Sequence, residues 1–420
     1  MTGHIDAAWR FRRKTGLVLT AGGSRGAYQA GVLKRIGELP ALRHKPSPFP
    51  IVTGASAGAI NGLMIAGGSE DFHGATRRLA FLWSQLEARQ VYRTDLRALL
   101  RNGLRLGLDA ATGSLLGAGR LQSLLDTAPL PDFLRAHLPV DGTARALAAG
   151  QLYALAVTAT GYHSGKSYTF IEGQPGHPLW LKSRRVALKA KIGIPHICAS
   201  AAIPVVFPPA PVEIDGATAW FGDGALRLTT PMSPAIRLGA SRVLAIGIRC
   251  ANTADHLTRA ELAPLAGDLG PSLRRPPLSQ ICGVFMNAVF LDHLDADLDH
   301  LKRMNELIAA MPEAGREAVS GRMREPIRVV EPLAIAPSED LAMIADAMKH
   351  RIPATVRYLL DALGAPDARS ADLTSYLLFD TQFTRELIRI GYEDAARRID
   401  EIEAFLRQPP AGGRRGQAED

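Results

Sequence analysis

The chain has 420 residues, of which 47% are hydrophobic and 21% charged, an ordinary globular composition that excludes global disorder. Its length suits one large α/β domain with an appended region, because single cores stop growing near roughly 250–300 residues. The formal net charge of +8 favours an anionic partner, such as an acidic lipid surface, or serves solubility alone.

Basic residues are scattered and aromatic residues make up only 6%, so no nucleic-acid partner is expected. Three widely spaced cysteines form neither a disulfide framework nor a zinc motif, which suits a reducing compartment. No apolar stretch is long enough to cross a bilayer, and Leu17–Leu19 is too short for a signal-peptide core. We therefore expect a cytoplasmic protein whose membrane contact is at most peripheral, at the inner face.

The N-terminal part alternates short apolar strands with helices. After a basic arm over residues 1–15, Gly16–Thr20 has the pattern of a buried parallel strand. Ala27–Leu39 has apolar residues at helical spacing, and the strand Ile51–Thr53 leads into an apolar helix over Ala57–Ala66. This order predicts a three-layer α/β/α sandwich with a mainly parallel sheet.

Further elements of this α/β domain, which we bound at residues 16–250, are expected up to residue 250. They are helices over 70–90 and 185–201, and strands over Tyr153–Thr160, Ser167–Ile171, Thr218–Phe221 and Val243–Ile248. Residues 96–126 are rich in Leu, Gly and Arg without clear periodicity, which makes them a candidate surface-active lid.

The pattern changes after residue 250. Residues 251–407 predict a mostly helical region that packs on the core, followed by a disordered tail over 408–420. Its expected elements are a loop over 252–278, helices over 280–310 and 380–406, a helix start at Ser338, and a strand over Ile327–Val330.

The most specific signal is Gly54-Ala-Ser56-Ala-Gly58, a G-x-S-x-G sequence between an apolar strand and an apolar helix. Small residues on either side allow a sharp turn that lifts the serine hydroxyl clear of the sheet. The helix N-terminus also favours negative charge on a tetrahedral intermediate. Ser56 is therefore a candidate nucleophile, with an N-capping serine in a packing turn as the structural alternative.

A second glycine-rich turn, Ala21-Gly-Gly-Ser-Arg-Gly26, also joins a strand to a helix. Clustered glycines allow backbone N–H groups to converge on an anion. We expect the N–H groups of Gly22, Gly23 and Ser24 to form an oxyanion hole. Arg25 is expected either to steady the loop or to contact a phosphate head group.

Two aspartates precede glycines within a short stretch. Asp215-Gly216 lies between two short apolar runs, where a hairpin favours Asp-Gly, so we assign it to a turn. Asp223, in Phe221-Gly-Asp223-Gly-Ala225 at a strand end, is the better candidate for a general base.

Together these three blocks resemble the patatin-like phospholipase family. Residues 17–66 carry the G-G-x-R-G and G-x-S-x-G blocks, and residues 198–240 carry the aspartate block with its upstream A-S-x-A-I-P segment. Ser375–Ala395 also resembles the C-terminal part of bacterial members. Two departures are Ala21, where many members have glycine, and Ala225, which the family tolerates.

The resemblance implies a Ser56–Asp223 dyad that acts on phospholipid or another acyl lipid, with no histidine, metal or cofactor in the catalytic set. A Ser–His–Asp triad is the alternative, with His256, His293 or His300 as the base. The sequence Leu291–Leu301 also contains histidines and aspartates. Its leucines have helical spacing, so we interpret it as a core stripe with a solvated acidic face rather than a metal site.

Three rival functions remain. An acyltransferase would use the same dyad with an alcohol as acyl acceptor. A nucleotide-binding module would use the 21–26 loop, which lacks both the Lys-Ser/Thr ending and the G-x-G-x-x-G spacing. A membrane-associated scaffold without activity would need neither Ser56 nor Asp223.

Overall fold

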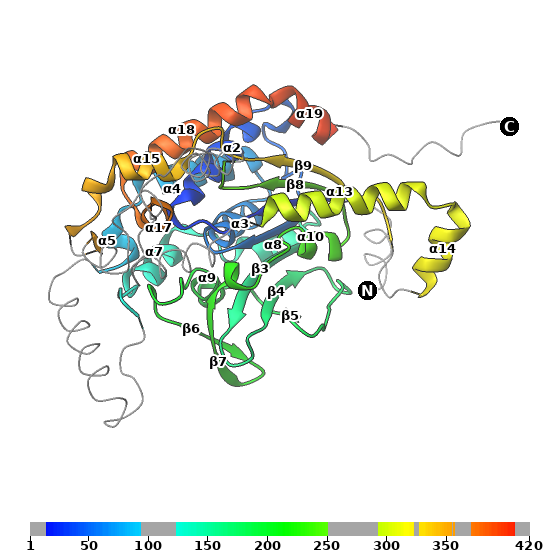
Figure 1. The fold of residues 1–420 in the computed structure, drawn as a ribbon, viewed down its shortest axis with the longest axis horizontal. Helices are drawn as coiled ribbons and strands as arrows, with labels where there is room; N and C mark the ends of the chain where they lie inside the picture. Colours follow the sequence, from blue (N-terminus) through cyan, green and yellow to red (C-terminus); the bar gives the residue numbers. More distant parts are fainter. Residues whose placement is uncertain are drawn as a thin grey trace, which may run out of the picture.

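The structure is a computed structural model that describes residues 14–93, 123–250, 293–322, 327–354, 356–357 and 371–407. The described chain forms one mixed, mainly parallel sheet with helices on both faces (Figure 1). The strands are β1 (Lys14–Leu19), β2 (Ile51–Ala55), β3 (Ala154–Gly161), β4 (Ser167–Gly173), β5 (Arg185–Lys189), β6 (Ala210–Ile214), β7 (Ala217–Asp223), β8 (Ala240–Ile246) and β9 (Glu331–Ile335).

The helices comprise α-helices and short 3-10 turns. The α-helices are α2 (Gly26–Gly37), α3 (Ala57–Gly67), α4 (Phe72–Gln85), α5 (Ala88–Val91), α7 (Pro129–His137), α8 (Gly142–Ala148), α9 (Ile194–Ser200), α10 (Ser233–Arg237), α13 (Leu294–Ala310), α14 (Glu313–Arg322), α15 (Leu341–Ala347), α17 (Ala371–Leu377), α18 (Thr381–Arg397) and α19 (Ile399–Arg407). The 3-10 turns are η1 (Gly23–Arg25), η2 (Pro40–Leu42), η3 (Gly224–Leu226) and η5 (Lys349–Arg351).

The strand order is β5-β4-β3-β2-β1-β8-β9, and the β6–β7 hairpin joins this sheet beside β3. The central pairs β3–β2, β2–β1 and β1–β8 are all parallel, whereas β4 and β7 run antiparallel to β3. Parallel strands joined through helices need both faces covered by helices, which explains the nearly continuous burial of β1, β2 and β3.

The two faces of the sheet bury alternate residues of each strand in separate cores. On β1, Leu17 and Leu19 pack in the larger core with α2, α3, α4 and α18. Val18 points to the other face, where the smaller core includes residues of α10 and α13. The expected three-layer α/β/α sandwich with a mainly parallel sheet is therefore confirmed.

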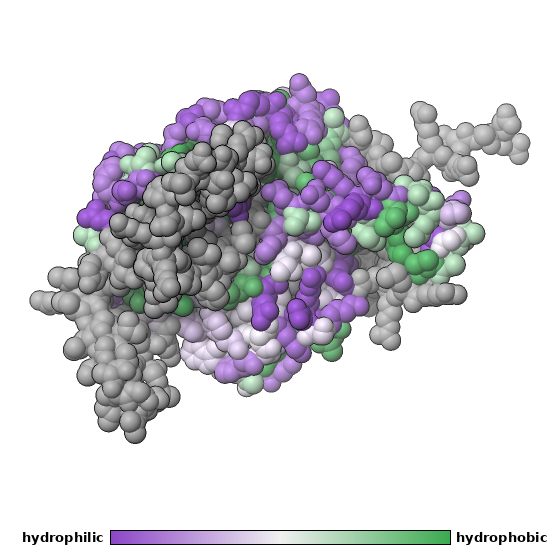
Figure 2. All heavy atoms as spheres, in the orientation of Figure 1, coloured by the Kyte–Doolittle hydropathy of each residue, from purple (hydrophilic) through white to green (hydrophobic). Residues whose placement is uncertain are grey.

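The C-terminal region completes both the sheet and one helical layer. β9 pairs with β8 at the edge of the sheet, and α18 lies along α2 (Figure 1). The Tyr28 hydroxyl of α2 donates a hydrogen bond to Asp394 of α18 at 3.0 Å. The outward side of α18 and α19 is mostly hydrophilic (Figure 2), as expected of an amphipathic outer layer. None of the described helices combines the length and the apolarity needed to cross a bilayer.

Two predicted elements are wrong. Residues 185–201, predicted as one helix, form strand β5 and helix α9, because Arg185–Lys189 pairs with β4 at the edge of the sheet. The strand predicted over Ile327–Val330 lies farther along the chain, at β9, and contains Pro332. Proline is tolerated there because β9 is an edge strand.

Several boundaries also differ. β1 begins at Lys14, so the last two residues of the expected arm over 1–15 belong to the sheet. The helix expected near Ser338 begins at Leu341, and the Asp340 carboxylate caps it by accepting from the Ala342 N–H. The helix expected over 380–406 is divided into α18 and α19 at Arg398.

Other expectations fall largely outside the described residues. The candidate lid over 96–126 is described only from residue 123, and the predicted helix over 280–310 only from residue 293. The expected loop over 252–278 and the tail over 408–420 lie wholly outside the described residues.

Candidate active site

Ser56 occupies a sharp turn between β2 and α3. Its backbone has φ 54° and ψ −125°, a conformation that non-glycine residues rarely adopt and that is often found at functional sites. The turn requires both flanking glycines. A Cβ on Gly54 would lie 2.1 Å from the Gly58 carbonyl oxygen, and one on Gly58 would lie 2.2 Å from the Leu19 carbonyl oxygen.

Strand β3 brings Ser56 and Asp223 together. β2 pairs with β3 as far as Ala55, which lies opposite Thr158. The next β3 residue, Ala159, pairs instead with Asp223 at the end of β7. Because β4 occupies the other edge of β3, β7 takes the place that β2 vacates. The ends of β2 and β7 therefore meet, although 167 positions separate Ser56 from Asp223 (223 − 56).

The Asp223 carboxylate accepts a hydrogen bond from the Ala225 N–H at 2.8 Å. It also lies within reach of the Ser56 hydroxyl, which lowers the pKa of the carboxylate as a hydrogen-bond donor. Asp223 is only 1% exposed, and this burial raises its pKa to about 6, although both hydrogen bonds act in the opposite direction. The group is thus mostly a carboxylate at neutral pH, yet more basic than an ordinary aspartate, which suits a general base.

Ser200 of α9 fixes the backbone of the turn. Its hydroxyl oxygen accepts a hydrogen bond from the Ser56 N–H at 2.8 Å and donates one to the Thr158 carbonyl at 2.6 Å. No role was expected for Ser200 from the sequence. The only sequence signal was its place in the A-S-x-A-I-P segment upstream of Asp223.

The glycine-rich loop lies beside Ser56. Gly23 has a φ of 52° and lines the same pocket as Ser56, and the turn is closed by a bond from the Arg25 N–H to the Gly22 carbonyl at 3.0 Å. Among the described residues, Gly22 and Gly23 donate no hydrogen bond to another backbone carbonyl. The expectation that these N–H groups bind an oxyanion stays a prediction.

Arg25 is only 3% exposed and points under the C-terminal region rather than outward. Its Nε donates to the Ser375 hydroxyl at 2.7 Å, and its guanidinium lies 4.7 Å from the centre of the Tyr376 ring. Of the two roles expected for Arg25, this geometry favours steadying the loop.

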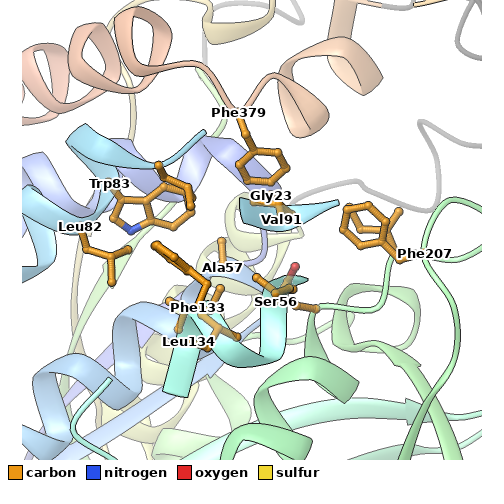
Figure 3. Close-up of a pocket in the computed structure, with 15 residues that line it drawn as sticks. Gly23, Ser56, Ala57, Leu82, Trp83, Val91, Phe133, Leu134, Phe207 and Phe379 are labelled. Carbon is orange, nitrogen blue, oxygen red and sulfur yellow. The ribbon is translucent and has the colours of Figure 1, made fainter. Parts of the chain in front are cut away.

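An apolar pocket opens at Ser56 (Figure 3). The pocket is narrow, with a cavity volume of only about 30 Å³. Its walls come from α3, α4, α7, the loop after α9 and the segment after α17; they include Trp83, Phe133, Leu134, Phe207 and Phe379. Such a lining suits a thin apolar chain.

Asp215 has the structural role expected from the sequence. It forms, with Gly216, the two-residue turn between β6 and β7, and both residues have positive φ, 50° and 80°. The turn is exposed to solvent and is separated from Asp223 by the length of β7.

The aspartate- and histidine-rich stretch forms the start of α13. Leu294 and Leu301 pack in the smaller core, as the stripe predicted. Asp297, however, is buried rather than solvated, because its carboxylate accepts a hydrogen bond from the Met232 N–H at 2.8 Å. Burial raises the pKa of Asp297, although the Met232 hydrogen bond and the nearby positive charges of His300, Arg185 and His293 act in the opposite direction. His256, the third candidate for a triad, lies outside the described residues.

The fold is a three-layer α/β/α sandwich with a serine on a strand-to-helix turn. The sequence model of the family described as patatin-like phospholipase matches residues 17–236, which is 220 of the 420 residues (236 − 17 + 1). The chain therefore belongs to the patatin-like phospholipase family, and this membership supports a lipid acyl hydrolase. No curated protein matches the chain.

Several solved structures match the chain, all with low sequence identity and low TM-scores. VipD from Legionella pneumophila is 12% identical with a TM-score of 0.30, and the match covers 93% of this chain and 67% of VipD. Human GIVD cytosolic phospholipase A2 in complex with methyl gamma-linolenyl fluorophosphonate is 14% identical with a TM-score of 0.40; the match covers 94% of this chain and 58% of that one. ExoU from Pseudomonas aeruginosa, solved with SpcU, is 16% identical with a TM-score of 0.23, and the match covers 97% and 81%. These values are too low to transfer functional detail, and the chain spans little more than half of the human enzyme.

Proposed function

We propose that the protein is a serine lipid acyl hydrolase with Ser56 as nucleophile and Asp223 as general base. The observation that carries this proposal is that the Ser56 hydroxyl, which lines an apolar pocket, lies within reach of the buried Asp223 carboxylate. The strained backbone of Ser56 and the glycine-rich loop beside it support the same function.

In the first step, the Ser56 oxygen attacks the carbonyl carbon of an acyl ester while Asp223 accepts the hydroxyl proton. The resulting oxyanion accepts hydrogen bonds from the N–H groups of Gly22, Gly23 and Ser24. When the intermediate collapses, the ester C–O bond breaks and the proton moves from Asp223 to the leaving alkoxide. The products are the free alcohol and an acyl group attached to Ser56.

In the second step, Asp223 accepts a proton from water as the water oxygen attacks the acyl-enzyme. The same N–H groups stabilise the second oxyanion. Collapse releases the fatty acid and returns the proton to the Ser56 oxygen. The dyad thus completes the cycle with its own groups and needs no cofactor.

The apolar pocket supports an acyl lipid as the substrate class. Its walls are almost wholly apolar, so the acyl chain of a phospholipid or another acyl lipid would bury its methylene groups there, at about 0.8 kcal/mol per group. The net charge of +8 is compatible with peripheral contact with an anionic membrane surface, from which such a substrate would be taken.

The test is labelling by a fluorophosphonate probe, with mass-spectrometric mapping of the adduct in wild type, Ser56→Ala, Asp223→Asn and Asp215→Asn. An adduct on Ser56 that is lost in the first two variants and kept in the third is expected. Asp215→Asn is the matched control, because it makes the same chemical change on an exposed turn. A folded wild type that gives no adduct in the presence of lipid vesicles would favour the inactive scaffold.

Product analysis separates the hydrolase from an acyltransferase on the same dyad. A phospholipid substrate is incubated with the enzyme in the presence of glycerol or lysolipid. Free fatty acid as the main product supports hydrolysis, whereas a new ester of the added alcohol in at least equal amount would support acyl transfer.

A further inference from the structure

The chain segment Ser375–Phe379, here called the C-terminal segment, lies directly on the glycine-rich loop. It spans the end of α17 and the turn that leads into α18, and each of its residues is buried. Phe379 reaches the pocket of Ser56, where Gly23 also lies (Figure 3). A segment about 350 positions away in the sequence therefore takes part in the same site as the loop.

Ser375 makes two hydrogen bonds to the loop, with different parts of the residue. Its carbonyl oxygen accepts from the Ser24 hydroxyl, and its own hydroxyl oxygen accepts from the Arg25 Nε at 2.7 Å. Ser24 and Ser375 are both fully buried. The bond from the Arg25 guanidinium to the Ser375 hydroxyl is expected to be strong, because hydrogen bonds that involve a charged group are stronger than those between neutral groups.

The neighbouring residues fix the segment in place. The Tyr92 hydroxyl donates to the Leu377 carbonyl at 2.9 Å, and the Tyr92 and Phe379 rings meet edge to face with centroids 6.1 Å apart. The Tyr376 carbonyl comes so close to Gly23 that a Cβ on Gly23 would lie 2.3 Å from its oxygen. Gly23 also has a positive φ, which glycine adopts readily. The conformation of the loop therefore depends both on this glycine and on the close approach of the C-terminal segment.

These contacts act on the turn that carries the N–H groups of the proposed oxyanion hole. Ser24 and Arg25 belong to the single 3-10 turn that begins at Gly23. Bonds from their side chains to Ser375 therefore set the direction in which the backbone N–H groups point. An oxyanion hole depends on that direction, because its donors must already face the position where the charge develops.

We propose that Ser375 is a positioning residue for the reaction, which holds the glycine-rich loop in its oxyanion-binding shape through Ser24 and Arg25. The proposal rests on the proposed function of Ser56 and its loop. Ser375 acts through the loop and does not itself contact the substrate.

The kinetic test compares Ser375→Ala with Ser69→Ala. Ser69 is equally buried, and its hydroxyl donates to the carbonyls of Ile65 and Ala66 at the end of α3, so this control removes a buried serine hydroxyl elsewhere. With a soluble acyl ester, Ser375→Ala is expected to lower kcat by about tenfold to a hundredfold with KM within about twofold. Ser69→Ala is expected to keep both constants. A kcat for Ser375→Ala equal to that of the control would overturn the proposal.

A second variant covers the case in which Ser375→Ala does not fold. Ser24→Ala keeps the Ser24 N–H that faces the oxyanion and removes only the hydroxyl that binds the Ser375 carbonyl. It is expected to lower kcat by at least about fivefold, and an unchanged kcat would count against the proposal.

Hydrogen–deuterium exchange tests the loop without reference to activity. Peptides that cover residues 16–27 are expected to exchange at least about tenfold faster in Ser375→Ala or Ser24→Ala than in wild type or Ser69→Ala. If the exchange of this peptide is unchanged in both Ser375→Ala and Ser24→Ala, the positioning role of Ser375 is refuted. A wild type that is folded and protected in this peptide but hydrolyses no ester would instead refute the proposed function.

Discussion

Replacing Asp223 by asparagine is expected to stabilise the protein at neutral pH while it abolishes hydrolysis. Burial raises the pKa of Asp223 from an ordinary value of 3.8 to about 6. The difference of about 2.2 pH units, at 1.36 kcal/mol per unit, corresponds to about 3 kcal/mol of unfolding free energy. An asparagine side chain carries no charge that burial could penalise.

The sign follows from which state loses the proton first. Since the folded pKa is raised, the unfolded chain ionises at Asp223 near pH 4 while the folded chain keeps its proton until about pH 6. Stability therefore falls by about 3 kcal/mol as pH rises through this window and is level above it. Asp223→Asn lacks this fall, so its advantage over wild type should grow by the same amount between pH 4 and pH 7.

Thermal unfolding of both proteins between pH 4 and pH 8 measures this difference. For a chain of 420 residues, about 3 kcal/mol corresponds to a shift of about 3 °C in Tm, because the unfolding entropy is about 2.1 cal/mol/K per residue. Other groups titrate alike in the two proteins and cancel in the difference. The Tm of Asp215→Asn should change with pH as the Tm of wild type does. If the Tm of Asp223→Asn also changes with pH as wild type does, burial does not raise the pKa of this carboxylate and the reasoning is wrong.

The remaining predictions concern the rate and the turn. Because the base must be ionised, kcat/KM for a soluble ester should rise with pH through about 6 and then level; an acid limb centred near pH 4 in rate measurements would contradict a raised pKa at Asp223. Ser200→Ala leaves the Ser56 N–H and the Thr158 carbonyl without their buried partner, so it should lose about 2–3 kcal/mol in urea unfolding and lower kcat; unchanged values would show that this serine does not hold the turn. Gly58→Ala should reduce activity more than tenfold or prevent folding, because the new Cβ would lie 2.2 Å from the Leu19 carbonyl oxygen. Gly62→Ala on the same helix is its control: its Cβ would meet nothing closer than 3.4 Å, so activity should persist and Tm rise slightly.

The proposed Ser56–Asp223 dyad could be predicted from the sequence because both residues lie in local motifs at strand ends. Each motif indicates its local geometry. The glycines around Ser56 permit the sharp turn, and the short strand β7 ends at Asp223. Ser200 and Ser375 could not be found in this way. Their roles depend on bonds to residues 144 and about 350 positions away, which no local pattern contains.

The errors in the fold have a similar cause. Arg185–Lys189 has too few residues for its alternation to be distinguished from a helix, and only pairing with β4 makes it a strand. At Ile327–Val330, β-branched residues pointed to a strand, but hydrogen bonding to β8 selects Glu331–Ile335 despite its proline. Neighbours in the sheet, rather than intrinsic propensity, decide both cases.

The contact between the glycine-rich loop and Ser375 also has a consequence for synthesis of the protein. A ribosome releases the chain from its N-terminus, so Ser56 and its loop emerge long before the residue that binds Ser24 and Arg25. While residue 375 is still unmade, the loop lacks these two bonds and the pocket lacks the Phe379 wall. A nascent chain would thus carry the proposed nucleophile beside an incomplete pocket and an unsupported loop until the segment around residue 375 has emerged.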